Sequence, residues 1–162
     1  AKYADVEEEM KGLAAEGAAL RKELIDSIQK DTESFTAYMN ALGMPKNTDE
    51  EKAARKEAMQ NGLKEAAEVP LAVAETALKI FHVAGAVVER GNANAVTDGL
   101  VASMMARTAV LSALLNVKIN LGSIKDEEFV ARMAAKVAEL EKAAMDGEKA
   151  VMELSALTRD LV

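Results

Sequence analysis

The fold is decided by residues 42–52, which read Leu42-Gly43-Met44-Pro45-Lys46-Asn47-Thr48-Asp49-Glu50-Glu51-Lys52. Gly43 and Pro45 end the helical pattern before them, because glycine frees the backbone and proline removes a donor and disfavours helix at the preceding residue. Thr48 and Glu51 have capping-box spacing: the hydroxyl accepts from the amide three residues on, and the glutamate reaches back to the cap. The stretch therefore predicts a loop and a second helix that begins near Asp49.

Outward from this loop, the chain is patterned as long helices. From residue 5 to about 40, apolar residues recur at steps of three or four once position 31 is included. These residues are Leu20, Leu24, Ile28, Phe35, Tyr38 and Leu42. The second helix is expected to reach Glu68, to kink or restart at Val69-Pro70, and to continue to about Arg90, where Gly91 supplies the stop.

Two further helices follow in the second half of the chain. Thr97-Asp98 offers a side-chain cap for a helix that reaches about Leu121. Asp126-Glu127-Glu128 opens another helix with four apolar residues on one side: Phe129, Met133, Val137 and Leu140. We expect an all-α fold, an up-and-down bundle of about four long helices, with residues 1–162 forming one domain that another chain completes.

The composition of the chain excludes several classes of function. The chain has 162 residues, no cysteine and a formal net charge of −7, with 50% hydrophobic but only 3% aromatic residues. The acidic balance argues against binding nucleic acid or an anionic membrane, although a local basic pocket could hold a small anion. Lack of cysteine excludes disulfides, thiolate zinc sites and a cysteine nucleophile, and fits a cytoplasmic location. Charged residues interrupt the apolar stretches 69–88 and 96–121, so we expect no membrane span; no signal-peptide pattern opens the chain.

The candidate catalytic residue of the first helix is Asp31. It occupies an apolar-stripe position between Ile28 and Phe35, so its carboxylate is expected to face the interior or an interface. Burial favours the protonated form of a carboxyl group, as general acid/base chemistry near neutral pH requires. Two structural interpretations stay open: a carboxylate paired with amides or an arginine, and a helix rotated so that Asp31 lies at its wet edge.

A second cluster of polar residues brackets the helix that follows Gly91. Asn92, Asn94 and Asp98 lie at its start, and Asn116 and Asn120 near its end. Asp98 and Asn116 share a face but are separated by roughly 27 Å of helical rise, so they cannot serve one site within a chain. Asn116 and Asn120 are four residues apart and can present two amides to a ligand. The alternatives are interhelical hydrogen bonding for the pair and capping for the loop.

Other residues favour structural roles. His82, the single histidine, is expected to be a partly buried packing residue beside Phe81 and Val83. Lys79 stands where a carboxylate-bridged metal bundle would have glutamate, so we predict no metal site. The nine methionines are interpreted as adaptable packing.

Several segments together resemble the formimidoyltetrahydrofolate cyclodeaminase and methenyltetrahydrofolate cyclohydrolase family. They are Asp31-Thr-Glu-Ser-Phe35-Thr-Ala-Tyr38, Met44 to Lys52, Glu68-Val69-Pro70-Leu71, Gly91-Asn92-Ala-Asn94 with Thr97-Asp98, and Leu115-Asn116-Val-Lys-Ile119-Asn120-Leu121. The resemblance extends from Lys2-Tyr3 to Phe129 and implies an all-helical, dimeric enzyme acting on a tetrahydrofolate derivative, without a metal or nucleotide cofactor.

The resemblance also implies roles for the residues singled out above. Asp31 matches the carboxylate of the family's Asp-x-x-x-Phe pattern, which is its catalytic acid/base. Asn92, Asn94 and Asp98 would lie beside the folate. Asn116 and Asn120 would offer amides to the pterin or to the partner subunit, and Lys46 would receive the negatively charged glutamate tail.

One departure from the family pattern supports a competing hypothesis. Family members carry, before the region matching Lys2-Tyr3, a helical segment with a Pro-Gly-Gly-Gly-Ser type motif that this sequence lacks. We therefore expect the domain to be N-terminally incomplete, and this chain alone to be inactive if that segment belongs to the pocket. The leading hypothesis is a cyclodeaminase and the second a cyclohydrolase. From a different class, a non-catalytic folate-binding or dimerising helical module would show binding without turnover.

Overall fold

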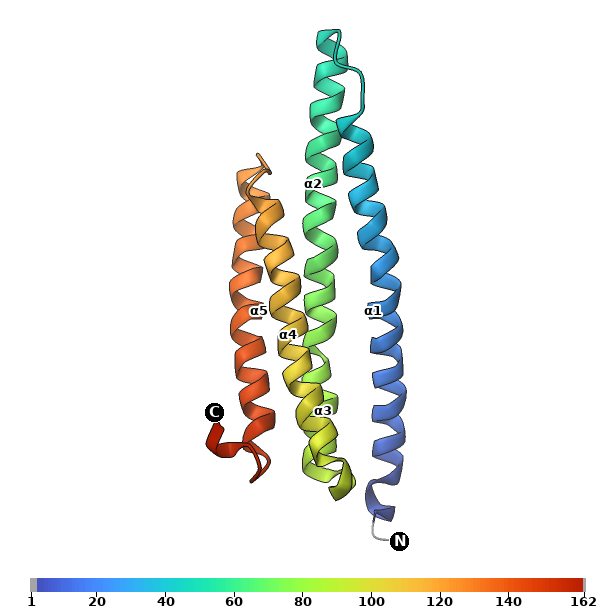
Figure 1. Ribbon diagram of the computed structural model, residues 1–162, viewed down its shortest axis with the longest axis vertical. Coiled ribbons are helices and arrows are strands. Elements are labelled where there is room, and N and C mark those ends of the chain that lie inside the picture. The colour runs from blue at the N-terminus through green and yellow to red at the C-terminus, as the bar shows by residue number, and fades with distance from the viewer. Residues whose placement is uncertain (1–2, 162) are drawn as a thin grey trace.

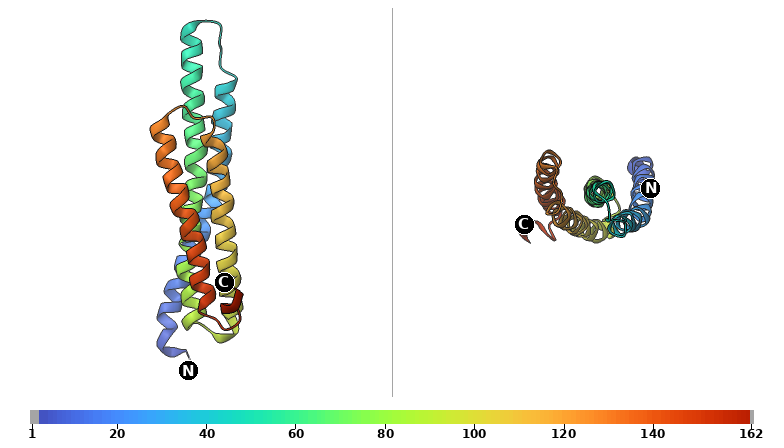
Figure 2. Two further views of the ribbon diagram at one scale, coloured as in Figure 1. Left: turned by 90° about the vertical axis from the view of Figure 1, so that its left-hand side faces the viewer. Right: turned by 90° about the horizontal axis from the view of Figure 1, so that it is seen from above.

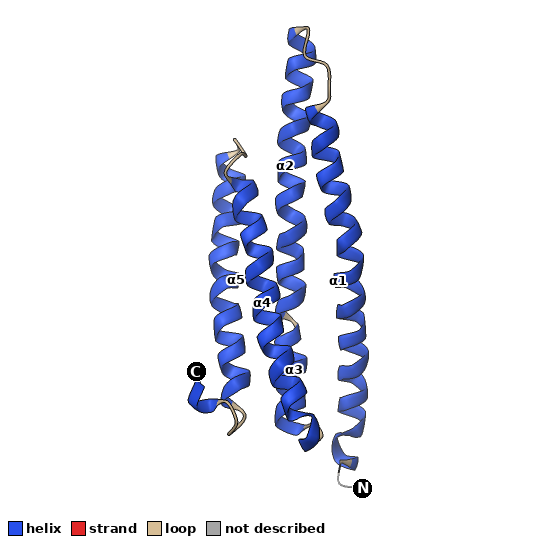
Figure 3. Cartoon of the chain, viewed as in Figure 1, coloured by secondary structure: helices blue, strands red, loops and turns tan. Residues whose placement is uncertain are grey.

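The computed structural model describes residues 3–161, and every regular element in that range is a helix (Figures 1 and 3). The long elements are α1 (Glu7–Leu42), α2 (Asp49–Leu78), α3 (Ile80–Arg90), α4 (Val96–Leu121) and α5 (Glu127–Glu153). Short 3₁₀ helices are η1 (Ala4–Val6), η2 (Ala93–Ala95) and η3 (Arg159–Leu161). The all-α bundle expected from the sequence is confirmed, while Lys2 lies outside the described residues.

The helices run alternately up and down around α2. Helix α2 packs against α1, α4 and α5, and α3 continues its line downward to pack on α4. Viewed from above, α1, α4 and α5 form an arc around α2 (Figure 2). The hairpin of α1 and α2 extends beyond the other helices at the upper end (Figure 1). This arrangement buries one side of α1 and leaves much of its other side open.

The loop and cap at residues 43–49 are confirmed. The Glu51 amide donates to Oγ1 of Thr48 at 3.2 Å, and the Thr48 amide donates to Oε2 of Glu51 at 3.2 Å, which is the reciprocal capping box. On the other side of the same loop, Arg55 donates from its guanidinium to the carbonyl of Leu42, the last residue of α1. Each of these two helix ends therefore has a side-chain partner for a free backbone group.

Of the two outcomes expected at Val69-Pro70, a restart of the helix is wrong, and a kink stays a prediction. Helix α2 passes through Pro70 without interruption, and the discontinuity falls at Lys79. There the amides of Lys79 and His82 bond to carbonyls three residues back, each at 3.2 Å, which tightens the turn between α2 and α3. Pro70 is tolerated because the carbonyl that it deprives of a partner is satisfied from another helix, as described below.

The core lies between α2, α3, α4 and α5. The side of α5 predicted to be apolar is buried in full, at Phe129, Met133, Val137 and Leu140. Asp126 caps that helix, its Oδ1 accepting from the Phe129 amide at 3.0 Å. Most other core positions on α2 and α3 are alanines, which allow the helices to approach closely.

The stripe predicted along α1 is only partly a core stripe. Ile28 and Phe35 are 68% and 62% exposed, whereas Leu13, Leu20, Ser34 and Ala41 are buried. The buried positions are spaced at multiples of seven, the pattern of a helix that packs mainly along one seam. The periodicity identified an apolar face correctly, but part of that face has no neighbour within the chain.

The cap expected from Thr97-Asp98 is also corrected. Helix α4 begins two residues earlier, at Val96 directly after η2, and no side-chain bond caps it at Ala95. Asn92 caps η2 instead, its Oδ1 accepting from the Asn94 amide at 3.0 Å. Asp98 does lie in the first turn of α4, where a negative charge complements the helix dipole.

Two helical segments are long and apolar enough to span a membrane by composition, against the expectation from the sequence. They are residues 49–90 and 93–121, and about a third of each apolar window, 33% and 39%, is buried inside the bundle. The finding rests on length and composition only, a test that the mostly buried core helix of a soluble protein also passes. The remaining apolar surface of the two segments is considered with the site.

Candidate functional site

An open groove lies between α1 and α4, with α2 as its floor. Its volume is about 440 Å³, within the size range of small-molecule sites. The lining residues are Leu24, Ser27, Ile28, Asp31 and Thr32 from α1, Pro70 and Val73 from α2, and Ala109, Ser112, Ala113 and Asn116 from α4. Most of them are apolar or small, while Asp31 and Asn116 provide a carboxylate and an amide from opposite walls. The groove thus brings together two residues that are 85 positions apart in the sequence.

Asp31 is exposed within the chain, so the expectation that it faces the interior is wrong. The interface that the sequence offered as the other possibility stays a prediction. Within residues 3–161 its carboxylate makes no hydrogen bond or ion pair, and only its backbone carbonyl is engaged, by Oγ of buried Ser34 at 2.9 Å. The helix therefore holds Asp31 in place through its backbone and leaves the carboxylate available at the lip of the groove.

Asn116 and Asn120 do not present their amides together. Asn116 is exposed and its Nδ2 makes a long bond to the Ser112 carbonyl at 3.4 Å. Asn120 is half-buried, and its Nδ2 donates to the carbonyls of Ala66 at 2.8 Å and Asn116 at 3.0 Å. Interhelical hydrogen bonding, one of the alternatives for this pair, is thereby confirmed for Asn120. Asn116 is the member of the pair that lines the groove.

The remaining polar candidates lie at the lower end of the molecule. Asn92 and Asn94 are exposed beside η2, and the Tyr3 hydroxyl donates to Oδ1 of Asn92 at 3.4 Å and accepts from the Ala93 amide at 3.1 Å. Asp98 is exposed in the first turn of α4. This cluster is separated from Asn116 by most of the length of α4, as the spacing predicted.

Lys46 lies at the opposite end, in the exposed loop at the tip of the hairpin of α1 and α2. From Asp31 to the end of α1 at Leu42 the helix rises by about 16 Å, and the loop continues beyond it. Within one chain, the predicted site residues therefore occupy three places: the tip, the groove and the lower end.

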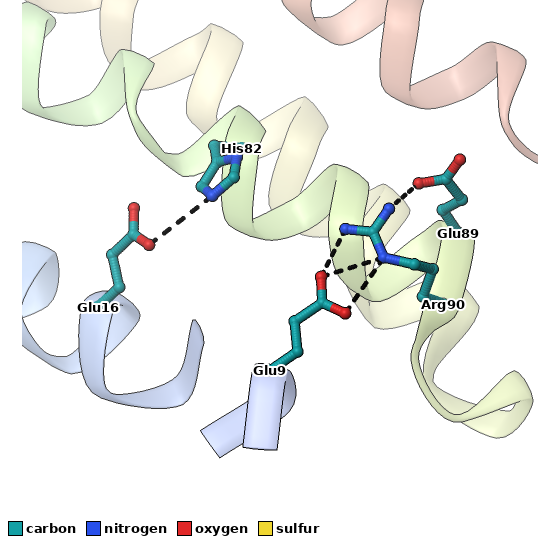
Figure 4. A network of polar contacts seen from close by, with 5 residues as sticks. All are labelled: Glu9, Glu16, His82, Glu89 and Arg90. Carbon is teal, nitrogen blue, oxygen red and sulfur yellow. Dashed lines mark hydrogen bonds and ion pairs between the residues drawn. The ribbon is translucent and has the colours of Figure 1, made fainter. Parts of the chain in front are cut away.

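The expectation of a partly buried His82 is wrong. Its side chain is 69% exposed, with Nε2 3.9 Å from Oε2 of Glu16 across the gap between α3 and α1 (Figure 4). Nearby, Arg90 bonds Glu9 through two nitrogens, at 2.6 and 3.0 Å, and also pairs with Glu89 (Figure 4). The guanidinium lowers the pKa of Glu9 by hydrogen bonding. These contacts tie α3 to the start of α1, away from the groove.

No cluster of three or more histidine, aspartate or glutamate side chains suited to a metal ion occurs in the described part of the chain. The interpretation of the methionines as packing holds for Met133, which is buried, but Met105 is 63% exposed on α4. Met105 is one of several apolar side chains that are exposed on α1 and α4.

Exposed apolar side chains lie on both of the helices that wall the groove. Those that are more than one third exposed on α1 are Ile25, Ile28, Phe35 and Met39; those on α4 are Val101, Met104, Met105, Leu115 and Ile119. The steps between most of them, counting Thr32, Thr108 and Ser112, alternate between three and four, as in a helix that faces another helix. We call these two sets the α1 rim and the α4 rim. The repeat of three and four residues was visible on α1 in the sequence, but the α4 rim was missed because α4 is apolar on several sides.

Comparison with known proteins places the chain in a family. Residues 1–139 match the formiminotransferase-cyclodeaminase family. The chain belongs to this family. The match covers α1 to α4 and about the first half of α5, and so includes the whole groove.

Individual members of the family are similar to the chain over most of its length. A methenyltetrahydrofolate cyclohydrolase from Methylorubrum extorquens is 41% identical over 79% of this chain. A formimidoyltransferase-cyclodeaminase from Gallus gallus is 36% identical over 82% of it. The crystal structure of formiminotetrahydrofolate cyclodeaminase from Thermotoga maritima superposes with a TM-score of 0.81 at 30% identity, over 98% of this chain and 74% of that one.

The chain spans only part of these relatives. It covers 62% of the length of the Methylorubrum extorquens protein and 24% of the length of the Gallus gallus protein. The family members similar to this chain thus include both cyclohydrolases and cyclodeaminases.

Proposed function

We propose that this chain is the folate-binding subunit of a one-carbon enzyme, a formimidoyltetrahydrofolate cyclodeaminase that converts 5-formimidoyltetrahydrofolate to 5,10-methenyltetrahydrofolate and ammonia. The observation that carries the proposal is that Asp31 and Asn116 both line one largely apolar groove in a chain of this family. Apolar walls suit the flat pterin, and two polar groups on opposite walls suit its one-carbon end.

Asp31 is the acid/base of the proposed reaction. The folate N10 attacks the formimidoyl carbon and forms a tetrahedral centre, which must then release ammonia. Ammonia leaves only after its nitrogen is protonated, so one group that accepts the N10 proton and returns a proton to the departing nitrogen serves both steps. The Asp31 carboxylate has no partner within the described residues that would compete for this task. The scheme uses no metal and no nucleotide.

A second function, methenyltetrahydrofolate cyclohydrolase, is favoured by the relative from Methylorubrum extorquens, which is 41% identical. In that reaction Asp31 activates water against the methenyl carbon to give 10-formyltetrahydrofolate. The same carboxylate, groove and substrate skeleton serve both reactions. The difference lies in whether ammonia leaves or water enters.

The proposal includes a homodimer in the cytoplasm. The α1 and α4 rims expose apolar side chains on the two helices that wall the groove, and a second copy covering them would remove water from the groove. A site that draws on two chains would also explain why Asn92, Asn94, Asp98 and Lys46 lie far from Asp31 within one chain. In this arrangement the lower end or the tip of the partner supplies the groups that bind the rest of the folate.

The test is a pair of assays on the same protein preparation. Supplied with 5-formimidoyltetrahydrofolate, the cyclodeaminase produces methenyl absorbance and equimolar ammonia. Supplied with 5,10-methenyltetrahydrofolate, a cyclohydrolase removes that absorbance faster than the uncatalysed reaction. Asp31→Asn is expected to lower the rate by at least about a hundredfold, the usual size of a general acid/base contribution.

The matched control is Asp26→Asn, which removes a carboxylate from the same helix where it pairs only with Lys22 at the surface. It should leave the rate unchanged. Full activity of Asp31→Asn would refute the assignment of the acid/base. Tight binding of a tetrahydrofolate analogue by a protein that turns over neither substrate would instead identify a non-catalytic folate-binding module.

A further inference from the structure

Pro70 leaves one backbone carbonyl in the middle of α2 without its helical donor. In an α-helix the amide of residue i donates to the carbonyl of residue i−4, so Pro70 cannot supply the bond that Ala66 would accept. A proline inside a helix usually causes a kink for this reason. Helix α2 nevertheless continues to Leu78, because Nδ2 of Asn120 in α4 donates to the Ala66 carbonyl at 2.8 Å.

The same side chain reaches the wall of the groove. Nδ2 of Asn120 also donates to the carbonyl of Asn116 at 3.0 Å, one turn earlier on α4. Pro70 and Asn116 both line the groove, whereas Asn120 stands behind them and is half-buried. One amide group therefore connects the floor of the groove on α2 with its wall on α4.

We propose that Asn120 is a positioning residue of the groove. Its side-chain amide replaces the backbone donor lost at Pro70 and so fixes where Pro70 and Asn116 stand relative to each other. An effect of Asn120 on folate binding rests on the function proposed above. The replacement of the missing Pro70 donor by the Asn120 amide does not depend on that function. Without the amide, Ala66 keeps an unsatisfied carbonyl between two helices, and α2 is free to bend at Pro70.

The first test is a double-mutant cycle on stability, which needs no ligand. Asn120→Ala, Pro70→Ala and the double variant are unfolded in urea beside the parent at one fixed protein concentration. In the parent, Asn120→Ala should reduce the ratio of folded to unfolded protein about tenfold, the cost of leaving one partly buried carbonyl unpaired. In the Pro70→Ala background the loss should fall below about threefold, because the new amide at position 70 serves Ala66.

The matched control is Asn61→Ala, which changes an exposed asparagine of α2 that makes no side-chain hydrogen bond in the described residues. It should not lower stability. Equal losses of stability from Asn120→Ala in both backgrounds would refute the claim that the Asn120 amide replaces the backbone donor lost at Pro70. The stability test needs no substrate, so it gives an answer even if the protein turns over no folate. An absence of turnover would instead reject the proposed function.

The second test separates positioning from stability alone. At a temperature where every variant is folded, Asn120→Ala should raise the KM for 5-formimidoyltetrahydrofolate about fivefold and lower kcat less than threefold, because Asp31 stands on another helix. The double variant should have the KM of Pro70→Ala alone. An unchanged KM in folded, active Asn120→Ala would show that the bond serves stability only, and would overturn the positioning role.

Discussion

Replacing Ile119 with serine is expected to break self-association. Ile119 belongs to the α4 rim and is 76% exposed, more than any other large apolar residue in the described part of the chain. Complete burial of an isoleucine side chain stabilises by about 1.5–3 kcal/mol, so covering the exposed three quarters is worth about 1–2 kcal/mol. Isoleucine and serine have similar helix propensities, and the side chain has few neighbours to lose within its own chain.

A symmetric dimer doubles this effect. Each copy contributes one Ile119 to a two-fold interface, so Ile119→Ser removes about 3 kcal/mol in total. The dimer dissociation constant should therefore rise by roughly a hundredfold, since each 1.4 kcal/mol corresponds to a factor of ten. Sedimentation equilibrium over a range of protein concentrations measures that constant directly.

Leu157→Ser is the matched control. Leu157 is 67% exposed but lies after α5, outside both rims. If exposed apolar area as such drove association, the two substitutions would have similar effects. A rise of less than about fivefold for Ile119→Ser, or an equal rise for Leu157→Ser, would refute the assignment of the α4 rim to a subunit interface. A parent chain that stays monomeric at all concentrations would refute it more directly.

Three further predictions concern the packing and the caps. Gly99→Ala should destabilise the fold by about 1–3 kcal/mol in urea unfolding, because the added Cβ would lie 2.7 Å from Cγ2 of Val88. Leu114→Ala should cost about 2–5 kcal/mol in the same assay, since this side chain of α4 is fully buried in the core. The hydrogen bond and salt bridge from Lys64 lower the pKa of Asp126 in the folded protein. The ionised carboxylate therefore adds to folding stability above its unfolded-state pKa, about 3.9, and this stability is lost as the pH falls through the lower folded-state pKa. Asp126→Asn should accordingly flatten the acid limb of a plot of stability against pH, and an unchanged limb would contradict the role of that pair.

The sequence predicted the elements where a local mechanism sets them. The capping box at Thr48 and the start of α5 at Asp126 depend on side chains and amides within one turn, and both formed as expected. Pro70 was misjudged because its effect depends on a residue 50 positions away, Asn120, which supplies the missing donor. Local rules state what a proline removes, but only the packed helices show what replaces it.

The candidate site was predicted in part. The step pattern around Ile28, Asp31 and Phe35 correctly marked an apolar face that carries a carboxylate. It could not distinguish a face that packs within the chain from one that stays open, because both need the same spacing of three and four residues. The meeting of Asp31 with Asn116 was not predictable from spacing, since it depends on how α1 and α4 are placed on either side of α2.

The exposure of Asp31 and the exposure of the rims have one explanation. A carboxylate in a water-filled groove is solvated like any surface aspartate, and apolar rims of this extent are costly on an isolated subunit. Covering the α1 and α4 rims with a second copy would bury the apolar side chains and dry the groove in the same step. Self-association and catalysis are therefore coupled in this proposal: Ile119→Ser, which touches neither Asp31 nor Asn116, should lower activity at protein concentrations below its raised dissociation constant and recover it above.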